Sequence, residues 1–191
     1  MKKYNGFKSE IMQGFEALPT GGYICDIKAA EVIPTNNGGE RLVISFDIAD
    51  GEHKGYFAKQ YKADNREDKK WKGVYNVFLP KGDGSQQDTW AVNRVNNLIG
   101  CLEDANPNFH WDWDEKKMKG CKVALVFRRE EFQKSDGTYG WTVKPFKVIS
   151  IGDCKDGKWG KYEDKPYANK PATTQSWAEA AGGDDSDLPW L

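Results

Sequence analysis

The stretch GGYICDIKAAEVIPTNNGGERLVISFDIAD, residues 21–50, decides the fold. Within it, ERLVISFDIAD (40–50) alternates in polarity, and one face carries Leu42, Ile44, Phe46 and Ile48. A period of two is typical of a half-buried β-strand. Residues 21–34 are also rich in β-forming residues, and the TNNGG between the two segments offers Asn and Gly for positive φ. This stretch therefore predicts two antiparallel strands joined by a hairpin.

Five further segments follow along the chain. GYFAKQYKA (55–63) is predicted to be the third strand, and VYNVFLP after it fits either a helical turn or a strand. DTWAVNRVNNLIGCLEDA (88–105) has apolar residues near a 3.6-residue period and predicts a helix capped by Asp88. GCKVALVFRREEFQ (120–133) and YGWTVKPFKVISIG (139–152) predict two strands, joined by a turn that contains Asp-Gly.

This order of elements predicts a mainly β fold. Three strands, a helix and a closing hairpin form the order of the five-stranded OB-fold barrel, with its helix between strands 3 and 4. Other small barrels and α+β sheets share the order and stay open as alternatives. Residues 1–154 would form the OB-fold-like domain, 155–183 a flexible linker and 184–191 an acidic tip, with the C-terminal tail disordered from about residue 166.

Composition excludes several classes of protein. The 191 residues are enough for one domain with appendages, and they contain no apolar run of the roughly 20 residues that span a bilayer. The N-terminus lacks the apolar core of a secretion signal, so we expect a cytoplasmic protein. The four cysteines and two histidines form no metal-binding pattern, and no catalytic motif is present. We therefore expect buried free thiols, no metal, no cofactor and no enzymatic activity.

Charge is distributed unevenly along the chain. Four acids and no base follow Pro171, so residues 1–170 carry 28 bases against the remaining 25 of the 29 acids. The body also places cations beside aromatic rings, which is the combination that single-stranded nucleic acid requires for its phosphates and bases. The candidate DNA-binding residues are Tyr56, Phe57, Lys59, Tyr61, Lys62, Trp71, Lys72, Arg128, Arg129, Phe132, Lys134, Tyr139, Trp141 and Lys144.

Strand alternation limits how many of these rings reach solvent. It places about half of them inside, and on 55–63 we expect the face with Phe57, Lys59 and Tyr61 to point outward. Core packing and base stacking are equally compatible with each single ring. A second aromatic segment, FHWDWDEKK (109–117), alternates tryptophan with aspartate, and its acids would repel phosphate. We expect this segment to pack against the barrel.

The end of the chain, GGDDSDLPWL, carries a resemblance. With a compact body and a linker, it resembles the acidic tip of bacterial and phage single-stranded DNA-binding proteins. ALPTGGYICDI, NNGGERLVISFDIADGEHKGY, GCKVALVF and DGTYGW resemble phage-encoded proteins of replication and recombination modules. The resemblance implies that the tip docks into replication, recombination and repair proteins and competes with DNA. The tip residues are Asp184, Asp185, Asp187, Leu188, Pro189, Trp190 and Leu191, where Trp190-Leu191 replaces the family's terminal phenylalanine.

The expected function is thus non-enzymatic binding and protection of single-stranded DNA, without strong sequence preference, during phage DNA replication and recombination in a bacterial host cell. Its partners would be single-stranded DNA, replication and recombination proteins, and a second copy of the chain as a further candidate. One alternative is an adaptor that binds replisome or recombination proteins without binding DNA. A carbohydrate-binding module would explain the eight tryptophans, but the free cysteines and acidic tip argue against it.

Overall fold

The computed structural model describes residues 16–36 and 38–168. The expected linker beyond residue 168 and the whole acidic tip therefore lie outside the described residues. The elements in chain order are β1 (Gly21–Pro34), β2 (Glu40–Ile48), α1 (Tyr56–Ala63), β3 (Val74–Phe78), α2 (Gln86–Ala105), the 3-10 helix η1 (Glu115–Met118), β4 (Lys122–Gln133), β5 (Tyr139–Ile149) and α3 (Ile151–Lys155).

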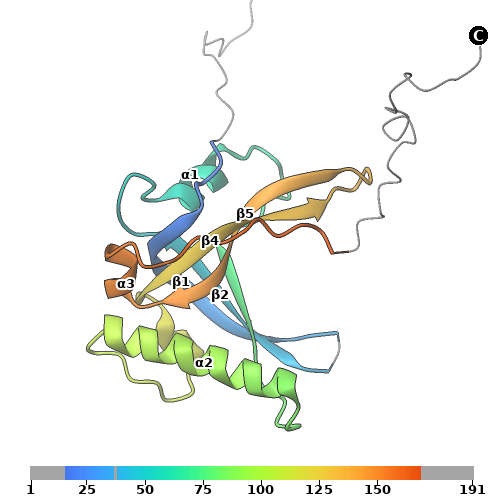
Figure 1. Ribbon diagram of the computed structural model, residues 1–191. Helices are drawn as coiled ribbons and strands as arrows, with labels where there is room; N and C mark the ends of the chain where they lie inside the picture. The colour runs from blue at the N-terminus through green and yellow to red at the C-terminus, as the bar shows by residue number, and fades with distance from the viewer. Residues whose placement is uncertain (1–15, 37, 169–191) are drawn as a thin grey trace, which may run out of the picture.

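The five strands form one antiparallel sheet in the order β3-β2-β1-β4-β5. Among the described residues no ladder joins β3 to β5, so the sheet is open and the prediction of a closed barrel is wrong. Figure 1 shows α1 at one end of this curved sheet and α2 across the other end. The mainly β class and the helix between the third and fourth strands are confirmed.

Both predicted hairpins are confirmed. β1 pairs with β2 from Cys25↔Ile48 to Pro34↔Glu40, and β4 pairs with β5 from Ala124↔Ile149 to Gln133↔Tyr139. The alternation in β2 also holds, because its predicted apolar face is buried throughout: Leu42, Ile44, Phe46 and Ile48. The fifth strand ends earlier than predicted, since residues 151–152 begin α3.

The predicted third strand over 55–63 is wrong, because residues 56–63 form helix α1. The carboxylate of Asp47 on β2 explains the helix. It accepts hydrogen bonds from the backbone N–H groups of Phe57 (3.0 Å) and Ala58 (3.2 Å), which belong to the first turn. A carboxylate at this position satisfies N–H groups that have no intrahelical partner and opposes the helix dipole. Asp47 is itself buried, at 4% exposure.

The third strand is instead β3, within the segment that fitted either a strand or a helical turn. Its Tyr75 and Val77 are buried, while Asn76 and Phe78 are exposed. Helix α2 begins two residues before its predicted start, and Ser85 rather than Asp88 is its N-cap. The Ser85 hydroxyl accepts from the Asp88 N–H at 3.1 Å. The Asp88 carboxylate instead accepts from the loop N–H groups of Lys81 and Gly82.

Two hydrophobic clusters hold the sheet. The main cluster joins α1, α2 and the sheet, and its fully enclosed side chains include Phe46, Phe127, Ile27, Leu98 and Leu102. The second cluster is centred on Ala124, Val126, Ile149 and Cys154, with Ile24, Phe146, Ile151 and Trp159 packed against it. Gly22 makes room for this cover, because a Cβ there would lie 2.7 Å from the Trp159 ring.

The burial of the cysteines and of two tryptophans can also be compared with the predictions from sequence. All four cysteines are free thiols, and Cys25, Cys121 and Cys154 are buried while Cys101 is partly buried. Of the two tryptophans expected to pack, Trp111 contacts the main cluster, but Trp113 is 84% exposed and that prediction is wrong for it. None of the helices within 16–36 and 38–168 combines the length and apolarity that a bilayer crossing requires.

Candidate nucleic-acid interface

A groove of about 520 Å³ lies where the sheet is left open, between the edges of β3 and β5. Helix α1 and the loop that follows it form one wall, and β5 forms the other. The lining residues are Ala17, Leu18, Tyr56, Phe57, Gln60, Trp71, Lys72, Val74, Asn76, Trp141, Thr142, Val143, Lys144 and Pro145. Six of the candidate DNA-binding residues are therefore brought together at this site: Tyr56, Phe57, Trp71, Lys72, Trp141 and Lys144.

Two of these six residues belong to α1 and are held in place by their contacts. Tyr56 donates its hydroxyl to the Glu16 carbonyl (3.0 Å) and accepts from the Leu18 N–H (3.2 Å). Burial, as the main cause, raises the pKa of Tyr56 above its ordinary value of 10.0. The Tyr56 hydroxyl therefore stays neutral. Phe57 is buried against Phe46, with ring centroids 5.3 Å apart. Phe57 thus forms the floor of the groove, and the predicted outward orientation of its ring is wrong.

Trp71 is fixed at the groove wall by its indole N–H. This group donates to the carbonyls of Phe46 (3.1 Å) and Gly73 (3.0 Å). Gly73 allows the close approach, because a Cβ at this position would lie 2.3 Å from the Phe46 carbonyl oxygen. The partly buried Trp71 ring lies 5.9 Å from the ring of Tyr61. The two hydrogen bonds therefore orient the indole, and the partly buried Trp71 ring presents a limited face to the groove.

Trp141 on β5 is the aromatic side chain most open to a ligand in this groove. It is 43% exposed, and the Arg129 guanidinium carbon lies 4.9 Å from the centroid of its ring. The register places Trp141 opposite Glu131 and Val143 opposite Arg129, so Arg129 reaches Trp141 diagonally along the same face. Lys72 and Lys144 are exposed on opposite walls. The groove lining contains no acidic side chain.

Several candidate residues lie away from the groove lining. Arg128 is partly buried, pairs with Glu130 at 3.0 Å and covers the ring of Phe146, which belongs to the second cluster. Phe132, Lys134 and Tyr139 lie toward the tip of the β4–β5 hairpin. On α1, Lys59, Tyr61 and Lys62 are exposed beyond the lining. Arg128 is the least suited of these to bind phosphate, because its charge is already opposed.

The sequence analysis did not identify three residues that shape the groove. Asn76 and Thr142 supply polar side chains, and Asp47 holds α1 as the wall. Asn76 would have been found by treating VYNVF as an alternating strand with buried Tyr75 and Val77. Asp47 gave a misleading signal, since a charged residue on the polar face of an alternating strand is ordinarily solvated.

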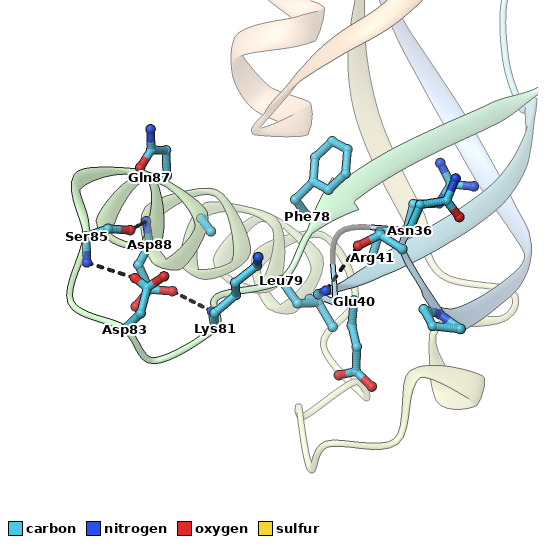
Figure 2. A pocket seen from close by; sticks show the side chains of 14 residues that line it. Asn36, Glu40, Arg41, Phe78, Leu79, Lys81, Asp83, Ser85, Gln87 and Asp88 are labelled. Atoms are coloured by element: carbon cyan, nitrogen blue, oxygen red, sulfur yellow. Dashed lines mark hydrogen bonds between the residues drawn. The ribbon is translucent and has the colours of Figure 1, made fainter.

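A second cavity, of about 560 Å³, lies between the β1–β2 hairpin, the end of β3 and the start of α2 (Figure 2). Its charged residues are Arg41 and Lys81 against Glu40, Asp83 and Asp88. The side-chain Nε of Arg41 is buried without a hydrogen-bond partner among the described residues. A hydrogen bond with the Ser85 side chain, and after it the Ser85 N–H that Asp83 accepts at 2.9 Å, lower the pKa of Asp83. Acids outnumber bases here, so this cavity is unsuited to a polyanion.

The described residues contain no group of three or more His, Cys, Asp or Glu side chains that could hold a metal ion. The thiols also lack the environment of a nucleophile. Burial raises the pKa of Cys25, Cys101, Cys121 and Cys154, which keeps each thiol protonated.

The protein is thus an open antiparallel sheet with a groove between its two edge strands, and this groove is lined by aromatic and basic residues. Residues 5–73 match the model of a family described as "Protein of unknown function (DUF669)". The match includes β1, β2, α1 and the loop through Trp71, and it stops before β3. None of the curated proteins matches the chain. The family description names no activity, so the functional argument rests on the groove.

Proposed function

We propose that the protein binds single-stranded DNA, without strong sequence preference, in the groove between β3 and β5. The observation that carries this proposal is the lining itself, which combines an exposed tryptophan with two lysines and contains no acid. Flat rings stack on bases of any sequence, and lysines release the counterions that are condensed on phosphates. A double helix would not offer its bases to this groove, whereas a single strand would.

The segments that form the two walls of the groove carry a net positive charge beyond that of the lining residues. Residues 56–72 carry six bases against three acids, and β5 carries Lys144 and Lys147 with no acid. Together these walls have a net charge of +5, in a chain whose net charge is −1. A strand running along the groove would thus keep its phosphates near Lys72 and Lys144 while a base stacks on Trp141. Asn76 and Thr142 would donate hydrogen bonds to phosphate or base oxygens.

The order of the strands supports an interpretation as an opened OB-fold. An OB-fold is a partly open five-stranded barrel, and its nucleic-acid ligands bind near its second and third strands and the loop between its last two. The groove borders β3, β5 and the α1 wall. Figure 1 shows the β4–β5 hairpin extending away from the rest of the sheet. We propose that a ligand occupies the gap that a closed barrel would fill with a β3–β5 ladder.

The remaining parts of the proposal concern residues outside the described ranges. The acidic tip at residues 184–191 would recruit replication or recombination proteins, and the part of the expected linker beyond residue 168 would connect it to the folded residues that form the groove. This assignment rests on the resemblance of the tip to those of phage and bacterial single-stranded DNA-binding proteins. It would place the protein in DNA replication and recombination in the cytoplasm of a bacterial host.

A fluorescence-anisotropy titration of labelled oligo-dT with the full chain tests the proposal. We expect binding at 50 mM salt that weakens steeply by 200 mM, with a slope of about −0.7 per phosphate contacted. A DNA duplex of equal length is the control and should bind more weakly. A chain lacking residues 184–191 should bind oligo-dT more tightly if the tip competes. Absence of binding at 50 mM salt by both chains would contradict the proposal and favour the adaptor alternative.

A further inference from the structure

The residues after α3 form a strap, defined here as residues 161–168, along β4. The Lys165 N–H donates to the Arg129 carbonyl, and the Glu131 N–H donates to the Lys165 carbonyl, both at 2.9 Å. These bonds form an isolated parallel bridge to Glu130. β1 pairs with β4 only as far as Phe127, which leaves that edge of β4 unpaired with β1 beyond this residue. The strap forms its bridge to β4 along this edge. Figure 1 shows the strap following the β4–β5 hairpin.

The strap places a carboxylate on a cation beside the groove. Asp164 Oδ2 lies 3.1 Å from Arg129 Nη1, and both side chains are nearly half exposed, at 44% and 47%. The same guanidinium lies over Trp141, the most open ring of the groove lining. A carboxylate and a phosphate are both recognised by guanidinium N–H groups. Asp164 therefore holds the position on Arg129 that a phosphate oxygen beside Trp141 would take.

The strap is attached mainly by exposed contacts, which include the hydrogen bond from Lys147 Nζ to the Tyr162 hydroxyl at 3.2 Å and the Lys165–Glu130 ion pair at 3.8 Å. Lys161 to Pro166 are all exposed, and Lys165 forms the bridge. Beyond it, the Tyr167 N–H donates to Glu131 Oε2 at 3.1 Å, and the Tyr167 ring lies 5.5 Å from that of Tyr139. Before it, the ring of Tyr162 lies 4.6 Å from that of Phe146. Segments with little buried apolar surface open locally at low cost.

We infer that the strap is a built-in competitor of nucleic acid: Asp164 occupies the phosphate position on Arg129, and the strap leaves β4 when a single strand binds. This inference rests on the proposed function of the groove. Exposed ion pairs contribute little to stability, so the phosphates of a polyanion can replace one carboxylate. The competition involves residues of the folded domain and is separate from any effect of the tip.

The test compares Asp164→Asn with a matched control, Asp156→Asn, in the full chain. Asp156 is also an exposed carboxylate in an ion pair, with Lys158 at 2.7 Å, and neither residue lines the groove. We expect Asp164→Asn to tighten oligo-dT binding about threefold at 50 mM salt and to steepen the salt slope by about 0.7, the value of one added contact. Asp156→Asn should leave both unchanged. Adding Arg129→Gln to Asp164→Asn should abolish the gain.

Hydrogen exchange supplies a second readout, because the Lys165 and Glu131 amides form the bridge. Saturating the wild-type chain with oligo-dT should make both amides exchange faster. If the wild type binds DNA but Asp164→Asn does not tighten binding, or if the two amides become more protected, the strap is a structural support and the inference is overturned. If the wild type binds no oligo-dT, the proposed function fails and the competition fails with it.

Discussion

The two cavities described above have similar volumes but opposite chemistry. The groove between β3 and β5 measures about 520 Å³ and the cavity beside α2 about 560 Å³. The groove contains two lysines and four aromatic residues without an acid, whereas the α2 cavity contains three acids, two bases and Phe78. In the α2 cavity, acids are already bound by backbone N–H groups. Volume therefore does not distinguish the two cavities, whereas the chemistry of their walls does.

The largest effect is expected from reversing charge in the groove. The double variant Lys72→Glu, Lys144→Glu should weaken oligo-dT binding roughly 100-fold at 50 mM salt and flatten the salt slope by about 1.4, because two phosphate contacts are lost. Lys81→Glu in the α2 cavity is the control and should change affinity little. Equal losses in both variants, measured by anisotropy, would mean that the two cavities share one ligand or that only net charge matters.

A smaller effect is expected on stability from the glycines beside each cavity. Gly73→Ala should lower the free energy of unfolding by about 2 kcal/mol, because the new Cβ would meet the backbone of Phe46 at 2.3 Å. In Gly39→Ala beside the α2 cavity, the new Cβ would meet the flexible end of Lys81 at 2.9 Å and the Thr35 hydroxyl oxygen at an ordinary 3.4 Å, so this change should be nearly neutral. Urea unfolding of the two variants measures the difference. A neutral Gly73→Ala would show that the groove wall is pliable.

Removing one exposed aromatic ring from each cavity should show which cavity contributes to DNA binding. Trp141→Ala should weaken oligo-dT binding about tenfold, in keeping with the roughly 1–3 kcal/mol of one stacked base. Phe78→Ala removes a ring of similar exposure, 54% against 43%, at the α2 cavity and should have little effect. Quenching of tryptophan fluorescence by bound DNA should also decrease in Trp141→Ala. The opposite ranking would move the stacking site to the end of β3.

The smallest effect is expected from pH. Tyr56 is the groove hydroxyl whose ionisation would add a negative charge beside the phosphates, and burial raises its pKa above 10.0. A raised pKa keeps the phenol protonated and neutral below that value, so affinity should change less than about twofold between pH 7 and 9. Tyr56→Phe should leave this flat profile unchanged. A decline in affinity that begins near pH 8 and disappears in Tyr56→Phe would contradict this assignment.

The parts of the fold that the sequence predicted are those with local causes. β1 and β2 follow from alternation and from a turn rich in Asn and Gly, which act within a few residues. Helix α1 depends on Asp47, which caps it from another element, so its own sequence gave no decisive signal. Closure of the sheet depends on the distance between β3 and β5, and no local pattern encodes that distance.

The sequence predicted which types of residue form the candidate site better than it predicted how these residues are arranged in space. Lys72 and Lys144 are far apart in sequence, and only the fold places them on facing walls. Arg128 and Arg129 are neighbours, yet strand alternation sends Arg128 to Phe146 and Arg129 to Trp141. Sequence reasoning treated the two arginines alike because the inner face of the hairpin was unknown. The ion pair of Arg129 with Asp164 was equally hidden, since the strap was expected to be linker.

The open sheet also bears on the solubility of the protein. Two edge strands without a ladder between them are places where another chain can add a strand and start aggregation. β3 is only five residues long. β5 carries Pro145, which has no N–H to donate, and two lysines lie close to this proline: Lys144 before it and Lys147 after Phe146. Short strands, prolines and lysines are the features that discourage such pairing. Lys144 would thus serve to bind phosphate and also to keep copies of the protein apart, so an apolar replacement should favour aggregation where a charged one would not.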